Sequence, residues 1–145
     1  MKYNERVFKL DSLSLGSVLN SECEGQQLVT LLEKIRVDIA VWFAADVNSK
    51  PMFPSQFSSQ TPERLGSTSR LISMSGEVDQ YFSGVFLGLI NDISDAKLLE
   101  QNYNTEDKYS DMEINFDIEI RALDTSYFEV YLKNSAWLKG LGSNL

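Results

Sequence analysis

Strict alternation of apolar and polar residues is the clearest pattern in the chain. Apolar side chains take every second position from Met112 to Ile120, and the alternation resumes over residues 127–132. A period of two residues is typical of a strand with one buried and one water-facing side. Residues 124–126 have turn chemistry, so residues 112–132 are predicted to form a β-hairpin.

Residues 22–36 have the spacing of a helix instead. Their leucine and isoleucine side chains recur three or four positions apart, and Ser21 and Glu24 fit a capping box at the start. Residues 37–45 then alternate between apolar and other side chains, which predicts a buried strand. The alternative for this segment is a continuation of the helix.

The patterns elsewhere are weaker. Residues 2–10 predict a first strand, and residues 94–101 predict a short helix. Residues 80–90 carry a helical apolar stripe but also two glycines, which disfavour a helix, so we interpret them as a strand with a helix as the alternative. Trp137, Leu138 and Leu141 form a short apolar tail that predicts a helical turn closing the core.

Residues 47–70 contain all three prolines of the chain and no sustained hydrophobic period. They predict a long loop with at most one short helical turn, and long loops in compact domains are usually functional or disordered. Met52, Phe53 and Phe57 argue against simple disorder. We expect these side chains to be tucked under the loop, with exposure to a partner as the alternative.

The chain has 145 residues, of which 43% are apolar and 23% are charged, as in an ordinary globular domain. We therefore expect one domain over residues 1–145. The predicted fold class is α+β: a mostly antiparallel sheet whose C-terminal β-hairpin packs against one or more helices.

The chain has no histidine and one cysteine, Cys23. This excludes Ser-His-Asp and Cys-His catalysis, an internal disulfide and a four-ligand zinc site of cysteine and histidine within the chain. No glycine-rich phosphate-binding motif occurs either. We expect a protein that is not an enzyme and that has no catalytic residue, metal site or cofactor.

The longest apolar stretch, Ile39–Ala45, is far shorter than the roughly 20 residues that cross a bilayer. The N-terminal residues are charged where a signal peptide would be apolar. We therefore expect a cytoplasmic protein without a membrane partner.

The net charge of −8 is concentrated near the C-terminus. Residues 91–145 have 5 Lys and Arg but 11 Asp and Glu, and all of these carboxylates lie between Asp92 and Glu129. Direct binding to nucleic acid is disfavoured because phosphates would be repelled and no basic cluster larger than a pair is visible.

The predicted hairpin places Glu113, Asp117 and Glu119 on one water-facing side. This row could simply keep an exposed sheet soluble. It could also be a docking face for a basic protein, since opposite potentials favour association and tyrosines beside carboxylates are common in interfaces. On the second interpretation, the predicted partner-binding residues are Glu113, Asp117, Glu119, Tyr127, Glu129 and Tyr131.

The passage Ile118–Lys133, with the sequence IEIRALDTSYFEVYLK, resembles the C-terminal strand pair of small acidic immunity proteins from bacterial polymorphic toxin systems, including contact-dependent growth inhibition. The resemblance covers roughly 20 residues and implies a cytoplasmic antidote. Such an antidote binds the toxic C-terminal domain of a delivered effector, often a nuclease, and blocks its active site or substrate-binding face. The resemblance assigns no contact residue.

Two alternatives use the same acidic residues. Asp111, Glu113, Asp117 and Glu119 could hold Mg²⁺ in a nuclease-like enzyme. The acidic row could instead imitate the phosphates of DNA and so inhibit a DNA-binding protein. A tight basic partner without turnover would favour the antidote over the enzyme.

Overall fold

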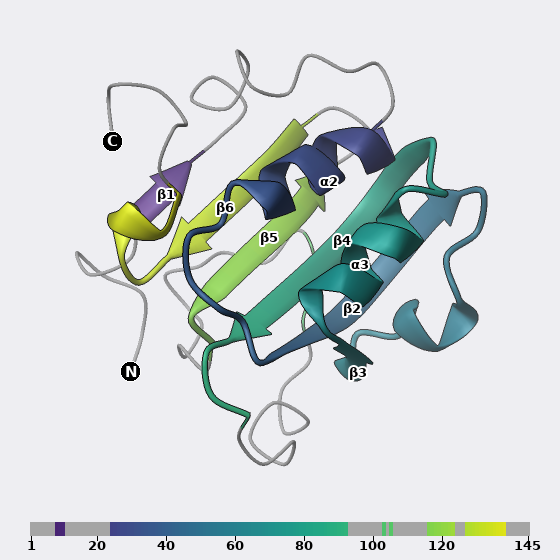
Figure 1. Ribbon diagram of the computed structural model, residues 1–145. Coiled ribbons are helices and arrows are strands. Elements are labelled where there is room, and N and C mark those ends of the chain that lie inside the picture. Colours follow the sequence, from purple (N-terminus) through teal and green to yellow (C-terminus); the bar gives the residue numbers. More distant parts are fainter. Residues whose placement is uncertain are drawn as a thin grey trace.

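The computed structural model is an α+β fold built on one antiparallel sheet (Figure 1). Its description covers residues 8–10, 24–92, 103, 105, 116–123 and 127–138. The sheet has six strands in the order β1-β6-β5-β4-β2-β3. Their bounds are β1 (Phe8–Leu10), β2 (Val41–Lys50), β3 (Glu63–Gly66), β4 (Gln80–Leu89), β5 (Ile118–Leu123) and β6 (Tyr127–Leu132).

Within the described residues, two α-helices cover one face of the sheet (Figure 1). They are α2 (Glu24–Glu33) and α3 (Thr68–Ser75), and short 3-10 turns occur at η1 (Ser55–Phe57) and η3 (Ser135–Leu138). The leucines of α2 that share one helical side are buried, and they meet the strand residues Ile118, Ile120 and Val130 in the larger core. Burial of this apolar stripe is what holds α2 to the sheet.

The opposite face of the sheet is buried as well. Val41, Phe43 and Leu87 form a smaller core there, together with Tyr103 and Phe116 from outside the strands β2 and β4. The sheet is therefore enclosed on both faces near β2 and β4. This second layer decides the environment of the predicted site.

The predicted α+β class, the helix in residues 22–36 and the C-terminal hairpin are confirmed. The strand interpretation of residues 80–90 is also confirmed, and the expected turn at Trp137 and Leu138 lies in η3. The hairpin pairs Glu119 with Tyr131. Its second strand is not at the edge of the sheet, because β1 pairs with β6 on the other side. Residues 2–7, Ser21, residues 94–101 as a helix and residues 112–115 lie outside the described residues.

The prediction of one long loop over residues 47–70 is wrong. β2 continues to Lys50, β3 pairs with β2, and α3 begins at Thr68. The helix was missed because it is short and only Leu71 and Ser75 are buried in it. Its start is stabilised locally, since the Ser67 side chain accepts a hydrogen bond from the backbone N–H of Arg70.

The strand predicted over residues 37–45 begins later, at Val41. Phe53 and Phe57 are buried as expected, whereas Met52 is 83% exposed. Within the described part of the chain, neither helix is long and apolar enough to pass through a lipid bilayer.

Candidate functional site

The structure places four residues of β5 and β6 on the sheet face that lies opposite α2 and α3. Glu119 pairs with Tyr131, and Arg121 pairs with Glu129, in the antiparallel register of the hairpin. Ile118 and Ile120, which alternate with Glu119 and Arg121 along β5, belong to the core on the helix side of the sheet. The predicted alternation is therefore correct in its register.

The expectation that this face is open to water is wrong for Glu119 and Tyr131. The Glu119 side chain is 0% exposed, and Tyr131 is 7% exposed. Glu119 forms an ion pair with Arg121, in which the arginine Nε lies 2.6 Å from the carboxylate Oε2. Since Arg121 is itself buried, the acidic row contains an internal positive charge at its centre.

Thr105 connects this ion pair to β2 and β4. Its carbonyl oxygen accepts a hydrogen bond from Arg121 Nη1 at 2.9 Å. Its hydroxyl donates to Asp46 Oδ2 at 2.8 Å and accepts from the backbone N–H of Gly84 at 3.0 Å. We call Asp46, Thr105, Glu119 and Arg121 the polar network: the last three are buried, Asp46 is half-buried, and the members satisfy one another's hydrogen-bonding groups.

Asp46 enters the network through a break in β2. Its φ of 53° is unusual for a residue other than glycine, although aspartate tolerates this region. The pairing of β2 with β4 shifts between Ala45 and Asn48, so the side chains change faces across Asp46. This bulge turns the Asp46 carboxylate towards Thr105, whose backbone N–H lies 2.9 Å from Oδ2.

Tyr131 and Glu129 form a second polar contact on the same face. The tyrosine hydroxyl donates to Glu129 Oε1 at 2.7 Å. Burial raises the pKa of Tyr131, and the hydrogen bond to Glu129 adds to this effect. The hydroxyl therefore remains protonated, and Glu129 is half-buried rather than freely exposed.

Asp117 lies directly before the first residue of β5. Its Oδ2 accepts a hydrogen bond from the backbone N–H of Ile90 at 2.8 Å, and its Oδ1 lies 3.6 Å from Lys133 Nζ. Both carboxylate oxygens of Asp117 therefore have partners within the domain. Glu113 lies outside the described residues, and the side chain of Tyr127 is not part of the description.

Asp92 belongs to the acidic segment in sequence but not to the hairpin in space. It forms a bidentate hydrogen-bonded pair with Arg64 on β3, at 2.8 and 3.1 Å, and β3 is the opposite edge of the sheet from β1. The hydrogen bonds from Arg64 lower the pKa of Asp92. The acidic segment is therefore divided between at least two parts of the surface.

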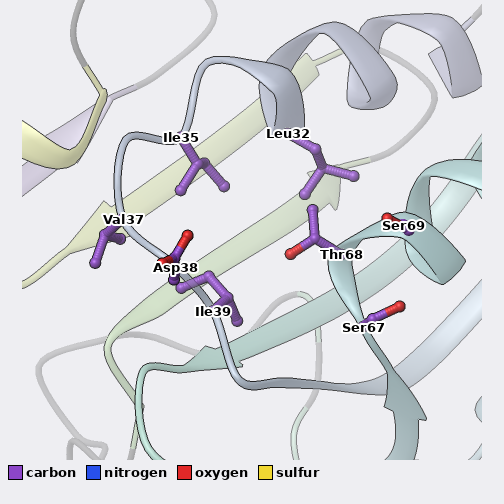
Figure 2. A pocket seen from close by; sticks show the side chains of 8 residues that line it. All are labelled: Leu32, Ile35, Val37, Asp38, Ile39, Ser67, Thr68 and Ser69. Atoms are coloured by element: carbon purple, nitrogen blue, oxygen red, sulfur yellow. The ribbon is translucent and has the colours of Figure 1, made fainter.

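A separate cavity of about 430 Å³ lies between the chain that follows α2 and the start of α3 (Figure 2). Aliphatic side chains of residues 35–39 form one side, and residues 67–69 form the other. Asp38 is the one charged residue among the described residues that line it. The cavity thus combines a carboxylate with the positive end of the α3 dipole and selects no single ligand charge.

Two of the three hydroxyl groups that line this cavity, those of Ser67 and Thr68, have structural partners. Ser67 Oγ accepts from Arg70 N, and Thr68 Oγ1 accepts from Trp42 Nε1 at 2.9 Å. These contacts stabilise α3 and the buried indole of Trp42.

Among the residues that the structure describes, no group of three or more His, Cys, Asp or Glu side chains is arranged to hold a metal ion. Asp117 and Glu119, two of the carboxylates considered for Mg²⁺, have the partners given above; Asp111 and Glu113 lie outside the described residues.

Sequence reasoning missed Arg121 and Asp46. The signal for Arg121 was a basic residue at the same-face position next to Glu119 in the alternating run. Asp46 gave no comparable signal, because its role depends on Thr105, which is distant in sequence. No protein-family model matches the chain, and no curated protein or solved structure matches it.

Proposed function

We propose that the protein binds a basic protein partner stoichiometrically. In this proposal the partner is a toxin domain, such as a nuclease, and the protein is its antidote. The observation that carries this proposal is the charge imbalance of residues 91–145, which contain 11 acidic and 5 basic residues. Opposite net charge increases association rates and disfavours wrong partners. The resemblance of Ile118–Lys133 to acidic immunity proteins gives the toxin as the partner.

The contacts within the described residues support binding more than catalysis. Glu119 and Arg121 are buried and engaged with each other, and Asp46 is engaged with Thr105. These groups stabilise the domain. Of the proposed docking residues within the described part of the chain, Asp117 and Glu129 are the acidic ones that keep some exposure to solvent, and the proposal adds Glu113 and Tyr127 from the sequence alone.

The test begins with affinity capture at low salt from the source organism, followed by mass spectrometry. Calorimetry with the purified partner then compares the parent with a Glu113→Lys/Glu129→Lys variant. We expect the affinity to fall about tenfold or more, because two attractive charges become repulsive. The captured partner should be basic, and its toxic activity should stop at a one-to-one ratio.

The matched control is Glu33→Lys/Glu63→Lys, which makes the same charge change at exposed positions away from the hairpin. It should alter affinity by less than about threefold. Equal effects of the two double variants would show that net charge, not this face, governs binding. Unchanged affinity in the hairpin variant would reject the face.

The other two functions have distinct outcomes in the same experiment. Capture of a DNA-binding protein that is displaced from DNA would favour a nucleic-acid mimic. Mg²⁺-dependent turnover of nucleic acid that Asp117→Asn abolishes, while thermal stability is kept, would favour an enzyme. Neither outcome is expected under the proposal.

A further inference from the structure

A cavity of about 230 Å³ lies at the C-terminal end of α3, opposite the end described above. Residues 51–54 form one wall, and Met74, Glu77 and Val78 form the other. The walls are mainly apolar, and Glu77 is the one charged residue among the described residues that line them. The cavity is below the size range of typical small-molecule sites and suits a single side chain.

The wall formed by residues 51–54 is held in place by the rest of the fold. Ser49 Oγ donates to the carbonyl of Pro51 at 2.8 Å and accepts from the backbone N–H of Phe53 at 2.9 Å. The Phe53 ring packs against Phe57 and Phe86, with ring centroids 5.6 and 6.2 Å away. A cavity with fixed walls loses little conformational entropy when it is filled.

Met52 stands apart from this packing. It is 83% exposed beside the cavity, while Phe53, the next residue, is 3% exposed. Methionine adapts its shape to different partners and is common on binding surfaces. The structure thus offers one apolar side chain of the loop to solvent at the rim of a preformed cavity.

The electrostatic environment favours a cation. Glu77 and Asp79 are both exposed after the end of α3, and the C-terminal end of a helix carries partial negative charge. Lys50 is exposed at the end of β2 and offsets part of this potential, but it does not line the cavity. A side chain with an apolar stem and a positive tip matches apolar walls that end at a carboxylate.

We infer that this cavity receives an arginine side chain of the basic protein partner, whose stem packs between Met52 and Val78 and whose guanidinium pairs with Glu77. The inference rests on the proposed function and adds a second contact, outside the hairpin. Arginine fits better than lysine because its planar guanidinium matches a carboxylate.

The test uses two small probes, N-acetyl-arginine amide and its neutral isostere N-acetyl-citrulline amide. Methyl NMR of Met52 and Met74 in the full chain should show saturable shifts with both probes at low salt. The arginine probe should bind about threefold more tightly, as expected for one partly exposed ion pair. The Glu77→Gln variant should bind both probes equally.

Glu33→Gln is the matched control, because it removes an exposed carboxylate of α2 that does not line the cavity. It should keep the preference for arginine. Absence of saturable shifts, equal affinities in the parent, or a preference that survives Glu77→Gln would each overturn the inference. Because the probes are small molecules, failure to capture a basic partner would count against the proposed function alone.

Discussion

Glu119 and Arg121 lie two residues apart on one face of β5 and form a fully buried ion pair, with 2.6 Å between Oε2 and Nε. Arg121 also donates to the Thr105 carbonyl. Its positive charge therefore neutralises the position that the sequence alone presents as the middle of an acidic row. The pair belongs to the interior of the domain and is not available to a partner at the surface.

We expect Arg121→Met to lower the free energy of unfolding by about 3–5 kcal/mol, since the Glu119 carboxylate would be left buried without its partner. The double variant Glu119→Leu/Arg121→Met should lose less, because no charge then remains buried. Urea denaturation followed by circular dichroism measures both. A double variant that is less stable than Arg121→Met would contradict the interpretation.

Ile118→Asp should abolish the cooperative unfolding transition. Ile118 is 0% exposed in the helix-side core, and a carboxylate there would have to be desolvated without a partner. Phe82→Asp is the control on the neighbouring strand, because Phe82 is 47% exposed. Its stability should change by less than about 1 kcal/mol. If Ile118→Asp melted like the parent, the register of β5 would be wrong.

Gly25 permits the close contact of α2 with the end of α3. A Cβ atom at this position would lie 2.1 Å from the carbonyl oxygens of Ser75 and Val78. We expect Gly25→Ala to cost about 1–3 kcal/mol in thermal or urea unfolding, even though alanine favours a helix. In Gly76→Ala the added atom has no neighbour nearer than 3.5 Å, so this variant should be as stable as the parent or slightly more so.

The stability of the protein should depend on pH through Glu24. Desolvation raises the pKa of Glu24, against the opposing effect of the hydrogen bond from the Tyr81 backbone N–H. A raised pKa means that the unfolded state ionises first, so stability is lost as the pH rises from the unfolded-state pKa to the folded-state pKa and is constant above it. Glu24→Gln keeps an acceptor for Tyr81 and remains neutral.

We therefore expect the unfolding free energy of Glu24→Gln, measured relative to the parent in urea, to be greater at pH 7 than at pH 4. Glu33→Gln, at an exposed position of the same helix, should show a smaller change between these pH values. A gain for Glu24→Gln that does not increase with pH would contradict the assigned burial of the charged form.

The elements that sequence patterns predict correctly are those whose periodicity follows from burial. The stripe of Leu28, Leu31 and Leu32 predicts α2, and the alternation around Ile118 and Ile120 predicts β5. β3 and α3 lack such a periodic pattern of burial. β3 is an edge strand defined by its pairing with β2, and α3 buries little of its own surface.

The candidate site likewise combines features that the local pattern predicts with features that it does not. Local alternation correctly predicts that Glu119, Tyr131 and Glu129 share a face. It contains no information on whether another layer covers that face. Glu119 is buried and paired with Arg121, so only the three-dimensional structure could separate a water-facing row from an internal ion pair.

The pairing of Phe8 with Leu132 joins the first and the last of the described strands. A ribosome produces residue 8 long before residue 132, so this edge of the sheet cannot form until residue 132 has been synthesised. Contacts of such high sequence separation slow folding and leave intermediates with unpaired strands. The pairing of β1 with β6 is therefore expected to be a late step of folding, and until it forms the backbone of β6 lacks a partner on that side.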